Sequence, residues 1–297
     1  MPSERYVRGC EIFAYCQLLG RHFKLYERAF LQTRVTAMRW HQDSARWLVS
    51  TDRGDTFRAR FVTTQSGIFN RPQLPGIEGI ETFKGKIFHS ARWDYRYTGG
   101  DTFGALDKLA DQQVGLLGTG TTALQVVPEV AKCAKHLFVF QRTPTAVGVR
   151  DNGPTDAAWF ASLPTGWQRQ REVSFNQLAN GERADCGLDD GWARFFRRLI
   201  DAVEAVPEVE RTPAAIGLAQ ELADYAYNDT VRARVDVEVK DPRTAALLTA
   251  YYRTLCKRPG FSDDYLPAFS VFSICPAEAR MSSRLGATPK IIAVVLA

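Results

Sequence analysis

The spacing of apolar residues changes character along the first third of the chain. Apolar residues recur at helical spacing around Ile12, Tyr15 and Leu18, which predicts a helix over residues 9–23. Short alternating runs at 33–40, 46–51 and 57–65 predict three strands. The DRGD segment at 52–55 is typical of a hairpin turn between the last two. A helix followed by a small antiparallel meander is therefore expected.

A second pattern follows a stretch rich in proline and glycine at residues 70–79. Proline removes backbone donors, so regular structure should stop there. Beyond it come an apolar strand at 113–117, a glycine turn at 118–120, an amphipathic helix at 122–134 and a second strand at 137–141. This order is that of a parallel βαβ unit. The sequence thus predicts an α/β fold with a Rossmann-like domain.

Helical periodicity dominates the next hundred residues. Residues 150–250 read as a helical insert, clearest at 192–206 and 214–231. From Val271 onward no periodicity is sustained, and no element is predicted there.

Composition narrows the classes of function. The net charge of +5 is small for 297 residues and the basic residues form no run, so no nucleic-acid partner is expected. No apolar run reaches the length of a membrane span and no signal peptide is evident, so we expect a cytoplasmic protein. The six cysteines form no CxxC pair, so no metal site is predicted.

The most informative motif lies between the first strand and the helix of the βαβ unit. It reads Gly118, Thr119, Gly120, Thr121, Thr122, Ala123. Gly118 permits a tight turn, Gly120 lets a pyrophosphate approach the backbone, and Ala123 allows close helix packing. The helix N-terminus adds N–H groups and a positive dipole end. An ordinary glycine-rich turn is the alternative interpretation.

The end of the second strand indicates which dinucleotide is bound. An NAD site usually places an acidic residue there, whereas this chain has Arg142 and Thr143. A guanidinium cannot accept from ribose hydroxyls but can bind a 2′-phosphate through two N–H groups. NADPH is therefore favoured over NADH. The alternative for Arg142 is a solvated surface arginine.

Residues 83–93 read FKGKIFHSARW and match the pattern FxGxxxHxxxW. Through this pattern the chain resembles the type I Baeyer–Villiger and flavin-containing monooxygenases, such as the 4-hydroxyacetophenone and cyclohexanone monooxygenases. The resemblance implies that His89 couples cofactor binding to domain motion, and that Phe83, Gly85 and Trp93 pack the linker. Asp94 stands where many members have proline.

A second resemblance lies in residues 251–265, YYRTLCKRPGFSDDY. It implies that Arg258 is the active-site arginine that stabilises negative charge during oxygen transfer, and that Lys257 binds the 2′-phosphate. Gly260 and Ser262 depart from the usual pattern. Without the resemblance, an exposed KRP turn would be the simpler interpretation.

The resemblance also implies an order of domains. We expect a partial FAD-binding domain at 1–78, a linker at 79–112, an NADP-binding domain with its insert at 113–250, a return segment at 251–269 and an atypical tail at 270–297. The family's first glycine motif, which binds FAD, has no counterpart before Arg5. We therefore expect an incomplete FAD-binding Rossmann-like domain in a chain truncated at both ends, with a tail from a shifted reading frame or a displaced stop.

Two functions follow from these expectations. The first is an NADPH- and FAD-dependent monooxygenase that transfers one oxygen atom of O2 to a ketone, amine or sulfide. The alternative is a catalytically inactive remnant that at most binds NADP(H).

Overall fold

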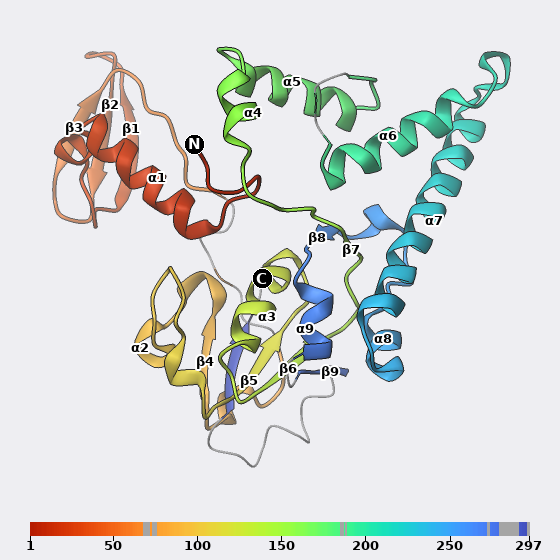
Figure 1. The fold of residues 1–297 in the computed structure, drawn as a ribbon. Helices are drawn as coiled ribbons and strands as arrows, with labels where there is room; N and C mark the ends of the chain where they lie inside the picture. The colour runs from red at the N-terminus through yellow and green to blue at the C-terminus, as the bar shows by residue number, and fades with distance from the viewer. Residues whose placement is uncertain are drawn as a thin grey trace. The chain divides into compact units, whose positions relative to one another are not determined.

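The structure is a computed structural model in two compact units (Figure 1). It describes residues 1–67, 72, 76–184, 187 and 189–271, and the backbone of strands at 274–278 and 291–295. One unit is Arg8–Pro72, and the other joins Met1–Val7 to Gln73–Ala297. Parts of the proline-rich stretch at 70–79 and of the tail at 270–297 lie outside the described residues.

The Arg8–Pro72 unit contains the predicted helix and meander. Its elements are α1 (Gly9–His22), β1 (Val35–His41), β2 (Arg46–Thr51) and β3 (Thr56–Ala59), with the strands antiparallel in the order β1-β2-β3. The hairpin turn at 52–55 is confirmed, because the Thr51 N–H donates to the Asp55 carbonyl over 3.0 Å. The third strand ends at Ala59, short of the predicted Gln65. Ala59 pairs with Trp47, and β2 begins at Arg46. Residues after Ala59 therefore have almost no part of β2 left to pair with.

The larger unit is built on a five-stranded parallel sheet in the order β4-β10-β5-β6-β9. Its strands are β4 (Lys86–His89), β5 (Gln113–Leu117), β6 (His136–Gln141), β9 (Ile274–Glu278) and β10 (Ile291–Val295). With α3 (Thr121–Ala131), strands β5 and β6 confirm the βαβ unit. The prediction that no element follows Val271 is wrong, because β9 and β10 both join this sheet. A strand of five residues is too short for hydrophobic periodicity to reveal.

Apolar side chains cover both faces of this sheet. Leu116 of β5 packs with Val127 of α3 and Leu266 of α9 (Tyr265–Val271) in the main core. Leu117, the next residue of β5, faces the other way and packs with Phe83 and Phe140. The glycine turn after Leu117 is therefore held at the end of a strand buried on both sides.

The predicted insert is a set of helices. They are α4 (Ala157–Ser162), α5 (Trp167–Ala179), α6 (Gly191–Glu204), α7 (Pro213–Glu238) and α8 (Pro242–Leu248). The helices predicted at 192–206 and 214–231 are confirmed as α6 and α7. α7 begins at a Thr212 cap followed by proline and continues seven residues beyond the prediction, to end beside α8 (Figure 1).

Short elements complete the fold. They are α2 (Tyr95–Thr98), the strands β7 (Val147–Gly148) and β8 (Gly260–Phe261), and 3-10 turns at Leu25–Arg28, Ile80–Thr82, Ser90–Arg92, Asp107–Leu109, Glu208–Glu210 and Thr254–Cys256. Within the described part of the chain, no helix is both long and apolar enough to span a membrane.

The first residues of the chain belong to the larger unit. The Arg5 N–H donates to the Gly153 carbonyl over 3.0 Å, and the Tyr6 N–H donates to the Asn152 side chain over 3.0 Å. The Arg150 guanidinium lies 4.7 Å from the centre of the Tyr6 ring. These contacts attach residues 3–6 to the start of the insert.

Strands β7 and β8 join the two ends of the insert. The Gly260 N–H donates to the Ala146 carbonyl over 3.2 Å. The ring of Phe261 packs against the ring of Trp192, with 5.4 Å between the ring centroids. A Cβ added to Gly191 would lie 2.3 Å from that ring. The close approach of Phe261 to α6 therefore depends on the missing side chain.

We predict that Gly191→Ala destabilises the protein by about 1–3 kcal/mol, because Phe261 has to move within a packed site. Gly217 is the matched control, since it also lies in a helix and nothing stands within 4 Å of its added Cβ. Gly217→Ala should leave stability unchanged or raise it by up to ~1 kcal/mol through helix propensity. Urea unfolding of both variants measures the difference, and equal effects would contradict this packing.

Asp263, two residues after β8, also fastens the start of the insert. Its carboxylate accepts the backbone N–H groups of Arg150, Asp151 and Asn152 over 2.9, 3.2 and 3.0 Å. Burial alone would raise the pKa of this carboxyl, but these three hydrogen bonds together lower the pKa below its ordinary value of 3.8. The ionised form is therefore the one that the fold stabilises.

A group whose pKa is lowered by folding contributes stability above its unfolded pKa, and this contribution disappears as the pH falls through the folded value. We predict that Asp263→Asn lowers the unfolding free energy at neutral pH and weakens its dependence on pH below 3.8. Asp236→Asn, an exposed change on α7, is the control. Unfolding curves across this pH range provide the measurement, and identical slopes for wild type and Asp263→Asn would refute the assignment.

Candidate functional site

The glycine turn after β5 has the geometry of a phosphate loop. Gly118 has a φ of +114°, a conformation open mainly to glycine, and its N–H donates to the Phe140 carbonyl over 2.9 Å. Gly120 is extended and is the N-cap of α3, and as a glycine it has no side chain to cap the helix. Ala123 is fully buried against the sheet. Backbone N–H groups at the N-terminus of α3 are the kind of donors that a pyrophosphate needs.

The loops that follow β5 and β6 are tied to each other. The Thr119 hydroxyl donates to the Thr143 carbonyl over 2.9 Å. In return, the Thr145 hydroxyl donates to the Thr119 carbonyl. These two bonds fix the glycine turn beside the end of β6, where a dinucleotide's ribose would lie.

The return segment places a cation at this same strand end. Lys257 Nζ donates to the Thr143 hydroxyl and lies 4.7 Å from the centre of the Tyr252 ring. The Tyr252 hydroxyl donates to the Pro144 carbonyl over 2.6 Å, and burial raises the pKa of Tyr252. Lys257 and Thr143, predicted separately from the sequence, are therefore in direct contact.

The two predicted arginines remain open to solvent. Arg142 precedes Thr143, and Arg258 follows Lys257 in the chain; both are exposed. Within the ranges that the structure describes, neither guanidinium has a hydrogen bond or an ion pair. Arg142 and Lys257 therefore present positive charge beside the glycine turn, and that charge suits a phosphate monoester.

The return segment is held in place by a buried carboxylate on α7. Asp224 is only 4% exposed and accepts the Thr254 N–H over 3.2 Å. It also accepts from Arg253 Nε over 3.3 Å. Asn228, one turn further along α7, donates to the Thr254 hydroxyl over 2.8 Å. Because Thr254 is three residues from Lys257, this anchor sets the position of the lysine.

Two arginines of α7 hold the neighbouring backbone. Arg232 Nε donates to the Ala250 carbonyl over 2.9 Å. Arg234 donates to the carbonyls of Val147 and Ser262 over 3.3 and 2.9 Å, and its charge is paired with Glu238 over 2.6 Å. Both ends of the insert are thus bound to one helix.

The residues of the FxGxxxHxxxW pattern lie around β4. Gly85 precedes the strand, Phe83 packs beneath the sheet, and Trp93 stacks edge-on against Phe88 and donates to Thr98 over 3.0 Å. His89, at the end of β4, is 6% exposed. Its strand is separated from β5 by β10, so His89 lies apart from the glycine turn in the sheet.

The hydrogen bonding of His89 fixes its tautomer. Its Nδ1 accepts the Ala91 N–H over 3.1 Å, so the proton of the neutral ring lies on Nε2. Nε2 is buried and finds no partner among the described residues. A buried donor of this kind is costly unless it finds an acceptor, so His89 is prepared to donate to a further group.

Asp94, which follows the FxGxxxHxxxW pattern, takes part in an ion pair. Its carboxylate lies 3.1 Å from Lys86 Nζ and 3.6 Å from Arg96 Nε. The hydrogen bond from Lys86, assisted by the charge of Arg96, lowers the pKa of Asp94. Asp94 therefore links β4 to α2.

Four residues that position the site were missed in the sequence: Thr145, Asp224, Asn228 and Tyr252. Asp224 and Asn228 stand four residues apart on a helix, as a polar pair on a buried face, and this spacing was the available signal. Thr145 and Tyr252 act through contacts to distant residues and carry no local signature.

The arrangement can hold the phosphates of one dinucleotide. Residues 118–123 fit a pyrophosphate, and Arg142 with Lys257 fit a 2′-phosphate. The described ranges contain one strand–glycine turn–helix unit. They also contain no group of three or more His, Cys, Asp or Glu side chains arranged for a metal.

Comparisons with known proteins show which family the chain belongs to. A model of the flavin-binding monooxygenase-like family (FMO-like) matches residues 3–157. The chain is 48% identical over 271 residues to neopentalenolactone D synthase of Streptomyces avermitilis and to Baeyer-Villiger monooxygenase ATR8 of Stachybotrys chlorohalonatus. A solved polycyclic ketone monooxygenase of Thermothelomyces thermophila is 34% identical, with a TM-score of 0.82.

These matches cover most of this chain and about half of each relative. They span 91% of the chain but 46% and 43% of the two sequence relatives, and 99% of the chain but 51% of the solved structure. The family model covers more than half of the chain. The chain therefore belongs to the flavin-binding monooxygenase-like family.

Proposed function

We propose that this chain is the NADP(H)-binding part of an NADPH- and FAD-dependent monooxygenase. The substrate is a small organic ketone, amine or sulfide, and O2 supplies the transferred oxygen atom. Family membership and the name of the Stachybotrys relative support this assignment. The observation that carries it is the contact of Lys257 with Thr143 beside the glycine turn.

Each residue of the site has a role in binding or positioning. The N–H groups at the start of α3 bind the pyrophosphate, and Gly118 and Gly120 keep side chains out of its path. Arg142 and Lys257 bind the 2′-phosphate, and from this we expect a preference for NADPH over NADH. The ring of Tyr252 and the hydrogen bond of Asp224 to Thr254 hold Lys257 in position.

Arg258 and His89 are proposed to act on other groups. Arg258 follows Lys257 and carries a guanidinium cation, so it can stabilise the negative charge that develops during oxygen transfer. The Nε2–H of His89 is proposed to donate to an acceptor that becomes available when cofactor binds. FAD, when bound, supplies the chemistry of oxygen activation.

The proposal is tested by an absorbance spectrum of the purified chain with added FAD, together with NADPH oxidation in air. The monooxygenase predicts retained flavin absorbance and NADPH consumption that depends on the organic substrate. A colourless chain that still binds NADP(H) would support the inactive alternative. Failure to bind either cofactor at saturating concentration would contradict both functions.

We predict that Arg142→Ala weakens NADPH binding by about 10- to 100-fold, because hydrogen bonds to a charged group contribute ~1.5–3 kcal/mol. NADH lacks the 2′-phosphate, so its affinity should change by less than about two-fold on the same reasoning. Fluorescence titration of both nucleotides gives the ratio. Arg169→Ala is the control, since Arg169 is an exposed arginine of α5 paired with Glu172. Equal losses for the two nucleotides would remove Arg142 from the 2′-phosphate site.

A further inference from the structure

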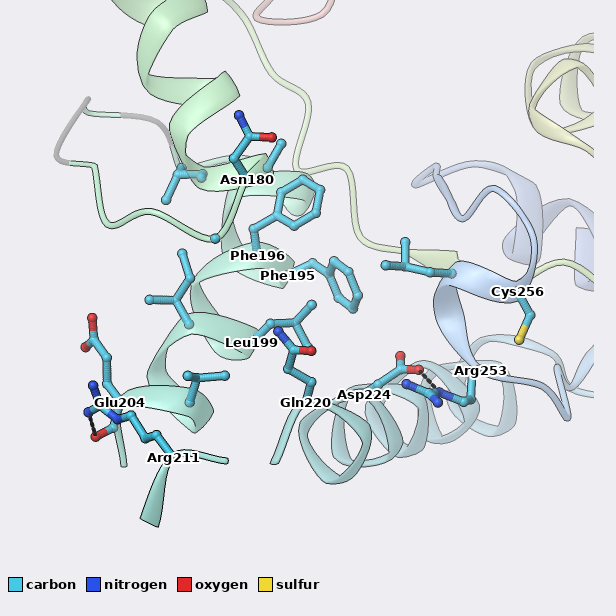
Figure 2. Close-up of a pocket in the computed structure, with 16 residues that line it drawn as sticks. Asn180, Phe195, Phe196, Leu199, Glu204, Arg211, Gln220, Asp224, Arg253 and Cys256 are labelled. Carbon is cyan, nitrogen blue, oxygen red and sulfur yellow. Dashed lines mark hydrogen bonds and ion pairs between the residues drawn. The ribbon is translucent and has the colours of Figure 1, made fainter. Parts of the chain in front are cut away.

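A cavity within the helical insert lies outside the nucleotide site. Its volume is about 830 Å³, and α5, α6, α7 and the segment at 253–256 line it (Figure 2). Binding sites for small organic molecules are typically clefts of roughly 300–1,000 Å³. The cavity is therefore large enough for a molecule of several rings.

The interior of this cavity is apolar. Phe195 and Leu178 are each 1% exposed, so the cavity walls that they form are parts of the folded core. Phe196, Leu199 and Val203 extend the same surface along α6. Burying an apolar ligand against such a surface is favourable by roughly 25 cal/mol per Å².

The polar groups at the rim are mostly engaged already. Figure 2 shows Arg253 directed at Asp224, and the pair is separated by 3.3 Å. Arg211 donates to the carbonyls of Val206 and Glu204 over 2.9 and 3.0 Å. A charged ligand would have to compete with these partners, so the rim favours a neutral one.

Two amide side chains that line the cavity are available. Asn180, which follows α5, and Gln220 of α7 have no side-chain hydrogen bond in the described structure, and both are labelled in Figure 2. An amide both donates and accepts, so it can recognise a carbonyl or a hydroxyl group.

We infer that this cavity binds a neutral, mainly apolar organic molecule that carries a carbonyl or hydroxyl group. Leu255 and Cys256 line the cavity, and the next residue is Lys257 of the nucleotide site. The two sites thus share one segment, and the Asp224–Arg253 pair both lines the cavity and anchors that segment. The inference concerns binding to this cavity, so it does not depend on monooxygenase activity.

Titration of the full chain with the neutral dye Nile red, without NADP(H) or FAD, tests the inference. The dye fluorescence should rise and saturate at about one dye per chain. Leu199→Trp fills the cavity and should weaken binding by at least about ten-fold. Leu218→Trp is the matched control, because Leu218 is 57% exposed on α7 and does not line the cavity. Equal affinities for both variants, or no saturable binding by wild type, would overturn the inference.

A second readout keeps the test decisive if Leu199→Trp folds poorly. Cys256 is an exposed free thiol that lines the cavity, whereas Cys16 is an exposed free thiol of the Arg8–Pro72 unit. Saturating Nile red should slow iodoacetamide alkylation of Cys256 in wild type at least about three-fold, if occupancy shields the thiol. The rate at Cys16 should not change. Peptide-resolved mass spectrometry measures both rates, and parallel rates with and without dye would place the dye elsewhere.

Discussion

The proposed nucleotide site depends on the buried carboxylate of Asp224. The chain leaves β6 at Gln141, passes through the helical insert and returns to the same strand end more than a hundred residues later. Closing so long a loop costs conformational entropy, so the return segment needs strong local contacts. Asp224 supplies such contacts by accepting hydrogen bonds from the Thr254 N–H and from the Arg253 guanidinium.

The other polar contacts of α7 extend this role. Asn228, Arg232 and Arg234 bind the Thr254 hydroxyl and the backbone at 250, 147 and 262. One helix therefore aligns both ends of the insert with the sheet. Removing a partner from such a buried network leaves unsatisfied polar groups, so the geometry at Lys257 is tightly constrained.

Local patterns in the sequence predicted the elements that depend on near neighbours. The α1 helix, the hairpin at 52–55 and the βαβ unit around Gly118 follow from periodicity and turn residues. β9 and β10 were missed, because a strand of five residues gains its place from the sheet that it joins. The end of β3 at Ala59 was missed for the same reason, since the length of β2 sets it.

The candidate site also has one part that local sequence patterns predicted and one part that they could not. The glycine turn and Arg142 were predicted from residue type and position, and the structure places Thr119 and Thr143 in contact there. The contact of Lys257 with Thr143 spans 114 residues, so no local pattern could reveal it. The family resemblance pointed to Lys257, and the α7 contacts now give the physical reason for its position.

If the glycine turn and the return segment form one nucleotide site, a bound nucleotide should protect both. Hydrogen–deuterium exchange of the full chain with saturating NADP+ measures this protection. We expect slower exchange both at residues 118–124 and at 252–259, with no change in α1. Protection of neither segment, or of residues 118–124 alone, would show that the two segments do not form one nucleotide site.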